Sequence, residues 1–167
     1  MGKTTVANAL AKALPGHVVS IDAILDRHGL EEWEGDYISV QSFLRANALA
    51  AEEARQVLAQ ELPVIFDGNF YFRAQIDDLL ERLEFPHAVF TLRAPLSECI
   101  ARDARRAVPL GEESARMVYS KVGEVEYGTG VDALRPVPEV VAEIVRQVQR
   151  ISATGLGAFS GGGDDTG

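Results

Sequence analysis

Cysteine is nearly absent from this 167-residue sequence, and apolar runs long enough to cross a membrane are absent altogether. The single cysteine, Cys99, cannot form an internal disulfide, and its apolar surroundings in an expected helix indicate a core residue rather than a reactive thiol. Apolar runs such as residues 64–66 have the length of a strand, and no charged segment followed by an apolar stretch marks a secretory signal. We therefore expect a cytoplasmic protein without a membrane partner.

Lysine is also scarce, occurring only at Lys3, Lys12 and Lys121. The sequence has 25 Asp and Glu against 16 Lys and Arg, which gives a net charge of −9. An acidic surface disfavours a long polyanion such as duplex DNA, because neutralisation of phosphates dominates that kind of binding. A small phosphorylated ligand in a local arginine pocket remains compatible with this charge. We therefore expect a small-molecule partner and no nucleic acid.

Helix patterns alternate with short, β-branched apolar runs along residues 1–151, which we interpret as one domain. Strands are expected at 17–21, 63–67, 87–92 and 131–134, and helices at 3–14, 39–61, 73–83, 95–108, 111–126 and 138–151. This alternation predicts an α/β fold in which a parallel sheet is flanked by helices on both faces. Residues 152–167 are rich in Gly, Ser and Asp, and we expect a disordered tail there.

The first candidate motif is Gly-Lys-Thr at residues 2–4, at the start of an expected helix. In a phosphate-binding loop, backbone amides at a helix N-terminus surround the phosphates, the lysine reaches their outer oxygens and the hydroxyl binds magnesium. Gly2 and Lys3 are therefore candidates for phosphate binding, and Thr4 for magnesium binding. Taken alone, the tripeptide is more often an ordinary helix start, so its interpretation depends on residues further along the chain.

Two aspartates lie at the ends of expected strands. Asp67 ends the apolar run 64–67, and Asp22 directly follows the run 17–21. Parallel strands bring their carboxyl ends to one edge of the sheet, where ligands bind, so both carboxylates are expected at the same edge. Asp67 is a candidate magnesium ligand, and Asp22 a candidate base for a hydroxyl that accepts a phosphoryl group. The alternatives are a tight Asp-Gly turn at Asp67 and a helix cap at Asp22.

Arginines cluster in the expected helix that begins near Pro95. Arg102, Arg105 and Arg106 are spaced at i, i+3 and i+4, which predicts that they share one helical face and converge. Such a cluster can clamp the oxygens of a phosphoryl group. The alternative, which we weigh equally, is pairing with the neighbouring acids Glu98, Asp103 and Glu112.

The loop after Asp67 adds candidates for binding a phosphoryl acceptor. Asn69, Phe70 and Tyr71 are candidates to shape its pocket. Arg73 is a candidate to bind the acceptor, and an ordinary arginine at a helix start is an equal alternative. Trp33 lies in an irregular polar stretch, where packing against the following helix is favoured over contact with the acceptor.

Taken together, these residues resemble the nucleoside-monophosphate-kinase-like branch of P-loop kinases, which includes shikimate, gluconate and adenylyl-sulfate kinases and chloramphenicol phosphotransferase. The similarity runs from Gly2 to about Arg150. Its motifs are GKTT at the first helix, the strand and turn VIFDGNF, the segment TLRAPLSECIARDARR and the closing GVDALRPVPEVVAEIV. The order and spacing of these motifs carry the resemblance, since no single one is specific.

The resemblance implies a P-loop NTPase fold of the adenylate-kinase type and an enzyme that transfers the γ-phosphoryl group of ATP to a hydroxyl or phosphate acceptor. It implies ATP and Mg²⁺ as cofactors and a mobile, arginine-rich lid around residues 102–112. The implied sites are Gly2, Lys3, Thr4 and Thr5 for the nucleotide, Thr4 and Asp67 for magnesium, Asp22, Asn69, Tyr71 and Arg73 for the acceptor, and Lys3, Asp22, Arg102, Arg105 and Arg106 for catalysis.

The sequence departs from this family at its start. The Gly-x-x-x of the phosphate loop does not precede Gly2, and neither does the strand before it, which is central in the family's sheet. We hypothesise that residue 1 is not the natural start of the protein but an internal position. Valine is usual at the last variable position of the loop, and its GTG codon would give Met1 if it were read as a start codon. A sheet without its central strand leaves backbone groups unpaired, so we expect this chain to fold poorly or bind ATP weakly.

Three alternatives to a small-molecule kinase stay open. One is a regulatory module that senses or hydrolyses ATP without an acceptor, and another is an inactive, truncated kinase. The third is a kinase that acts on RNA or DNA ends, which the acidic charge and the lack of a basic stripe disfavour.

Overall fold

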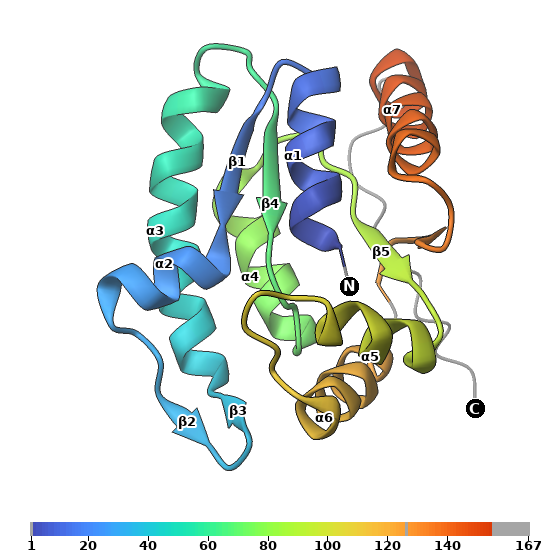
Figure 1. Ribbon diagram of the computed structural model, residues 1–167. Helices are drawn as coiled ribbons and strands as arrows, with labels where there is room; N and C mark the ends of the chain where they lie inside the picture. Colours follow the sequence, from blue (N-terminus) through green and yellow to red (C-terminus); the bar gives the residue numbers. More distant parts are fainter. Residues whose placement is uncertain (1, 126, 155–167) are drawn as a thin grey trace, which may run out of the picture.

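Two separate pairs of parallel strands form the centre of the molecule (Figure 1). In the computed structural model, which describes residues 2–125 and 127–154, β1 (His17–Ser20) pairs with β4 (Val64–Asp67). The second pair joins β5 (Phe90–Arg93) to β6 (Thr129–Asp132). The alternation of strands and helices along the chain and the parallel pairing confirm the predicted α/β class.

No strand of the described residues lies between β4 and β5. The two strands instead line a cavity of about 410 Å³, together with apolar side chains of three helices, α1 (Lys3–Ala13), α4 (Arg73–Leu83) and α7 (Val137–Thr154). The expectation of a sheet that lacks its central strand is confirmed.

Helices cover both faces of the strand pairs. Figure 1 shows α1 in front of the strands and α4 behind them. α1 packs on α7, and α3 (Val40–Leu58) packs on α4. These contacts enclose two cores, one around Phe43 on α3 and the other around Val131 on β6. Cys99 is buried, as predicted, and no helix in the described part of the chain is long and apolar enough to cross a membrane.

The segment after β1 differs from the sequence prediction. α2 (Ile21–His28) begins directly after the strand, and the Ser20 side chain accepts a hydrogen bond from the Ala23 amide at 3.2 Å. Ser20 is therefore the helix cap, and Asp22 lies in the first turn rather than at a strand end or a cap. A hairpin of β2 (Trp33–Glu34) and β3 (Tyr37–Ile38) follows. Trp33 is 61% exposed, so the predicted packing against the next helix is wrong.

Two further boundaries differ from the sequence prediction. α5 (Leu96–Ala104) ends before Arg105, and α6 (Glu112–Gly123) follows after a loop of residues 105–111. At the carboxyl end of the chain, α7 continues to Thr154, three residues into the predicted tail 152–167. Residues 155–167 of that tail lie outside the described residues.

Candidate active site

The amino end of α1 carries the Gly-Lys-Thr motif, with Gly2 directly before the helix. Gly2 precedes the helix with φ of +86°, a left-handed conformation that glycine adopts without steric cost. Among the described residues, no side chain caps this end of the helix, so none of them occupies the first-turn amides as a cap. A Cβ placed on Gly2 would lie 3.7 Å from Arg102 Nη1. The first-turn amides and a neighbouring guanidinium make this helix end suitable for an anion.

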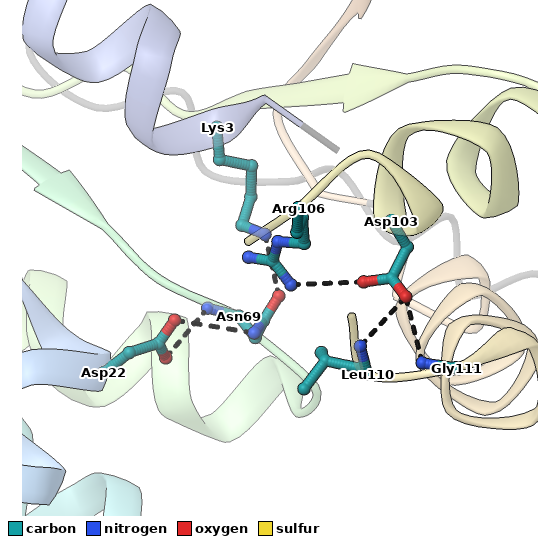
Figure 2. Close-up of polar contacts among 7 residues, drawn as sticks. All are labelled: Lys3, Asp22, Asn69, Asp103, Arg106, Leu110 and Gly111. Atoms are coloured by element: carbon teal, nitrogen blue, oxygen red, sulfur yellow. Dashed lines mark hydrogen bonds and ion pairs between the residues drawn. The ribbon is translucent and has the colours of Figure 1, made fainter. Parts of the chain in front are cut away.

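Asn69 lies between Lys3, a predicted phosphate ligand, and Asp22, a predicted acceptor ligand (Figure 2). Lys3 Nζ donates to Asn69 Oδ1 at 2.8 Å. The Asn69 backbone amide and Nδ2 donate to the Asp22 carboxylate at 3.4 and 3.5 Å. Asn69 thereby holds the lysine and the aspartate on either side of one amide group.

Lys3, Asp22 and Asp67 form one electrostatic cluster at the carboxyl ends of β1 and β4. Burial lowers the pKa of Lys3, and the charges of Asp22 and Asp67 oppose this shift. Desolvation by the surrounding protein raises the pKa of Asp22, while the Lys3 charge and the Asn69 amide hydrogen bond act in the opposite direction. The two aspartates therefore lie at the same edge, as the sequence predicts, and Asp67 is 7% exposed.

The three predicted arginines do not share a helical face, because α5 ends at Ala104. Arg102 donates to Glu98 Oε1 at 2.7 Å and to the Ala133 carbonyl at 2.8 Å. Arg105 is the C-cap residue of α5. Arg106 lies beyond the helix and extends toward Lys3 and Asn69 (Figure 2), and its charge acts to lower the pKa of both Lys3 and Asp22. Of the three predicted arginines, Arg106 is therefore the one whose charge acts on both Lys3 and Asp22.

On the acceptor side, Tyr71 lies beside Asp22 in an aromatic cluster. Its ring centroid is 5.9 Å from that of Tyr37 and 5.7 Å from that of Phe43. Burial, followed by the charge of Asp22, raises the pKa of Tyr71 to about 12. The phenol therefore stays protonated at neutral pH and keeps a hydroxyl that can donate a hydrogen bond.

Arg73 faces a different set of partners. Its Nε lies 3.7 Å from Asp77 Oδ2, and its guanidinium carbon lies 5.2 Å from the Tyr127 ring centroid. It is also the first residue of α4. The structure thus favours the alternative of a helix-start arginine over the predicted acceptor ligand.

Two residues that the sequence did not single out support the site. Gln75, fully buried on α4, donates to the Asn69 carbonyl and accepts from the Tyr71 amide, both at 3.2 Å. Lys121 on α6 lies 5.7 Å from the Tyr37 ring centroid and 5.4 Å from that of Phe72. A glutamine among the apolar positions of a predicted helix was the available signal for Gln75, whereas nothing local marks Lys121.

The residues predicted for magnesium provide oxygen ligands of the kind that this ion takes. Mg²⁺ is usually bound by one or two carboxylates together with substrate phosphates, so a group of three acids is not required. The described residues contain no such group of three. Asp67 lies close enough for its charge to act on the pKa of Asp22, and Thr4 is exposed at the helix start. These residues fit the ion.

The parallel α/β core, with Gly-Lys-Thr opening a helix at its carboxyl edge, defines a P-loop nucleotide-binding protein. The chain belongs to the AAA domain family AAA_33, whose model matches residues 1–121. The fold is shared with a gluconokinase from Sinorhizobium meliloti 1021, with a TM-score of 0.68, 19% identity and coverage of 92% of this chain and 88% of that one.

A sugar kinase from Janibacter sp. HTCC2649 is similar to the same degree, with a TM-score of 0.67, 18% identity and coverage of 89% and 88% of the two chains. No curated protein matches the sequence significantly. The resemblance to P-loop kinases that the motifs indicated is therefore confirmed in family and fold.

Proposed function

We propose that this protein is an ATP- and Mg²⁺-dependent kinase that phosphorylates a small hydroxyl-bearing acceptor. The observation that supports this most directly is the Lys3–Asn69–Asp22 arrangement beside the amino end of α1, with Arg106 extending into it. It combines cationic groups for a phosphoryl group with a carboxylate for a hydroxyl proton, which are the two requirements of phosphoryl transfer.

The nucleotide end of the site consists of the amides of Lys3, Thr4 and Thr5 and the Lys3 ammonium group. Thr4 and Asp67 would hold the magnesium ion, which would supply charge neutralisation at the phosphates. Arg102, next to Gly2, adds positive charge on the same side. These groups bind and orient the triphosphate.

At the acceptor end, Asp22 takes the proton of the attacking hydroxyl. A bond forms between the acceptor oxygen and the γ-phosphorus, and the bond from that phosphorus to the β–γ bridging oxygen breaks, so that ADP leaves with the electron pair. Lys3 and Arg106 stabilise the charge on the transferred group. Asn69 keeps Asp22 oriented, and Tyr71 keeps a hydroxyl available to the acceptor.

Two observations support a class of acceptor: the polar side chains on the acceptor side of the site and the names of the similar structures. Two structures similar to this one carry the names gluconokinase and sugar kinase. A polar acceptor side with an amide, a phenol and a carboxylate suits a polyhydroxylated small molecule. Gluconate and other sugar acids, sugars and polyols are therefore the first acceptors to test, with no nucleic acid expected at a net charge of −9.

Lys3→Ala tests this function directly. We expect kcat with the best acceptor to fall about 10²- to 10³-fold, because a group that stabilises the transferred charge is lost. The fold should stay near intact, because the first turn of α1 keeps its hydrogen bond from the Val6 amide to the Gly2 carbonyl. Lys12→Ala is the matched control, since Lys12 is an exposed lysine on the same helix. The assay is acceptor-dependent ADP release, with the phosphorylated product identified by ³¹P NMR.

Two results would contradict the proposal. If Lys3→Ala retained the turnover of the Lys12→Ala control, the lysine would have no role in transfer. If ADP release were the same with and without every acceptor, the chain would be an ATP-hydrolysing module instead of a kinase.

A further inference from the structure

Asp103 is a buried carboxylate at the end of α5 that accepts three hydrogen bonds (Figure 2). Its Oδ2 accepts from the backbone amides of Leu110 and Gly111, each at 3.0 Å. Its Oδ1 accepts from Arg106 Nη1 at 3.3 Å. One side chain therefore joins both ends of the loop 105–111 and also contacts the arginine that this loop carries.

Apolar burial does not hold this loop in place. Val108 is 78% exposed and Leu110 is 60% exposed, so neither contributes to a core. Arg106 itself has a half-exposed side chain. A long side chain on an exposed loop samples many rotamers unless polar contacts restrict it. Apart from backbone hydrogen bonds to α5 and α6, the described polar contacts of this loop are those to the Asp103 carboxylate.

The position of Arg106 matters because of the charged residues of the candidate site near its side chain. Its charge acts on both Lys3 and Asp22, which belong to different elements, α1 and α2. Figure 2 shows the Arg106 side chain extending from the loop toward Lys3 and Asn69, while Asp103 contacts it from the opposite side. A carboxylate behind a guanidinium fixes its direction without reaching the reacting atoms.

We propose that Asp103 is a positioning residue that closes the loop 105–111 and thereby directs Arg106 at the transferred phosphoryl group. The inference rests on the proposed function, since it assigns Arg106 to the transfer step. Asp103 touches neither nucleotide nor acceptor, so its removal should weaken catalysis only through Arg106.

A double-mutant cycle tests this coupling. Asp103→Ala should lower kcat about tenfold and leave KM for ATP and acceptor within about twofold, because the effect appears in the transition state. Arg106→Ala should lower kcat at least as much. In the Arg106→Ala background, Asp103→Ala should have no further effect on kcat. Asp103→Asn should give a smaller loss, since its amide oxygen still accepts from the Leu110 and Gly111 amides.

The control is Glu112→Gln, which removes an exposed carboxylate that pairs with Arg116 at the start of α6. Its kcat should equal that of the parent. Asp103→Asn also covers the case in which Asp103→Ala fails to fold, because it retains the volume of the side chain. A tenfold loss from Asp103→Ala that persists in the Arg106→Ala background would overturn the inference, and so would an unchanged kcat in Asp103→Ala.

Failure of the proposed function has a different signature. A parent protein with no acceptor-dependent turnover contradicts the kinase, and the position of Arg106 is then measured by NMR of its Nη1 protons, which lie at the contact with Asp103. We expect slow exchange of those protons in the parent and fast exchange in Asp103→Ala. Equal exchange rates in the two proteins would overturn the positioning role.

Discussion

Lys3 and Asp22 carry opposite charges that their surroundings disfavour. Burial lowers the pKa of the lysine, and desolvation by the surrounding protein raises that of the aspartate, so each residue depends on the other and on Asn69 to remain charged. A carboxylate with a raised pKa is a better proton acceptor than an ordinary aspartate. The same environment that destabilises Asp22 in its charged form would therefore favour the role of base that we propose for it.

Asp22→Asn separates these two effects. We expect kcat to fall about 10²-fold, because the base is lost. The folded Asp22 carboxyl binds its proton more tightly than the unfolded one, so its stabilising effect is present at low pH and is lost as pH rises through the raised pKa. The asparagine side chain does not titrate, so the variant should equal or exceed the parent in thermal midpoint at pH 7 and lose this advantage toward about pH 4.

The measurements are the pH profile of kcat and thermal unfolding over the range from about pH 3 to about pH 8, which includes the usual aspartate pKa of about 3.9. The parent's rate should decline on the acid side at a pH above that usual value. Asp26→Asn, an exposed residue near the end of the same helix, is the control. A variant that retained full turnover would remove Asp22 from the mechanism.

At the scale of elements, the loop between β4 and α4 is held by the helix that follows it. Gln75 accepts from the Tyr71 amide and donates to the Asn69 carbonyl, which sets the direction of the Asn69 side chain. The Asn47 side chain, buried on α3, donates to the Gln75 carbonyl at 2.8 Å. The packing of α3 on α4 is thereby linked to the position of the loop that carries Asn69.

Gln75→Ala should destabilise the protein and impair catalysis together. Two backbone groups of the loop lose their partner, and we expect the free energy of unfolding to fall by about 2 to 3 kcal/mol. We also expect kcat to fall, because Asn69 no longer holds Lys3 and Asp22 in one geometry. Urea unfolding and the kinase assay measure the two effects. Glu81→Ala, an exposed position on α4, should change the stability by less than about 0.5 kcal/mol.

The prediction would be contradicted in one specific way. If Gln75→Ala unfolded at the same urea concentration as Glu81→Ala, the hydrogen bonds to Asn69 and Tyr71 would contribute nothing to the loop.

At the scale of the whole molecule, the cavity between β4 and β5 separates the two strand pairs. It has a volume of about 410 Å³ and an apolar lining from both strands and from α1, α4 and α7. A pair of strands is marginally stable alone, and here each pair has one edge facing this cavity. The amino end of α1 lies between the carboxyl ends of β4 and β5 (Figure 1), so a strand placed in the cavity can lead directly into Gly2.

A chain extended before Gly2 by a strand of about five β-branched residues and a short glycine-containing loop tests the role of this cavity. We expect the urea midpoint to rise and an ATP analogue to bind more tightly, because the strand pairs with both edges and the loop adds amides to the phosphate site. The matched control is an extension of the same length with serine in place of the β-branched residues. Equal midpoints for the two extensions would show that the cavity does not accept a strand.

Particular elements show how much of the structure could be predicted from the sequence. The strand run 64–67 and the helix 73–83 were predicted to within a residue, because β-branched and amphipathic patterns are local. The helix predicted over 95–108 ends at Ala104, where the Asp103 carboxylate turns the chain back toward Leu110 and Gly111. Helical periodicity alone cannot show a side chain that binds backbone amides seven and eight residues ahead.

The candidate site likewise contains residues that the sequence predicted correctly and others that it did not. Lys3, Asp22 and Asp67 were identified from their positions at a helix start and at strand ends, and Asn69 from the loop after Asp67. The structure brings these residues together. Arg73 and the common face of Arg102, Arg105 and Arg106 were not supported, because Arg73 faces Asp77 and α5 ends too early. Gln75 and Asp103 gained their importance only from contacts made across the fold.

The sequence by itself determined the α/β class, the order of the elements and the Gly-Lys-Thr start of the first helix, since each depends on periodicity, capping and turn chemistry within short segments. Only the tertiary structure decided which charged groups meet, which arginine faces them and where the sheet is interrupted. Those outcomes depend on pairing between residues far apart in the chain, such as Lys3 with Asn69 and His17 with Val64, and on the burial that this pairing produces.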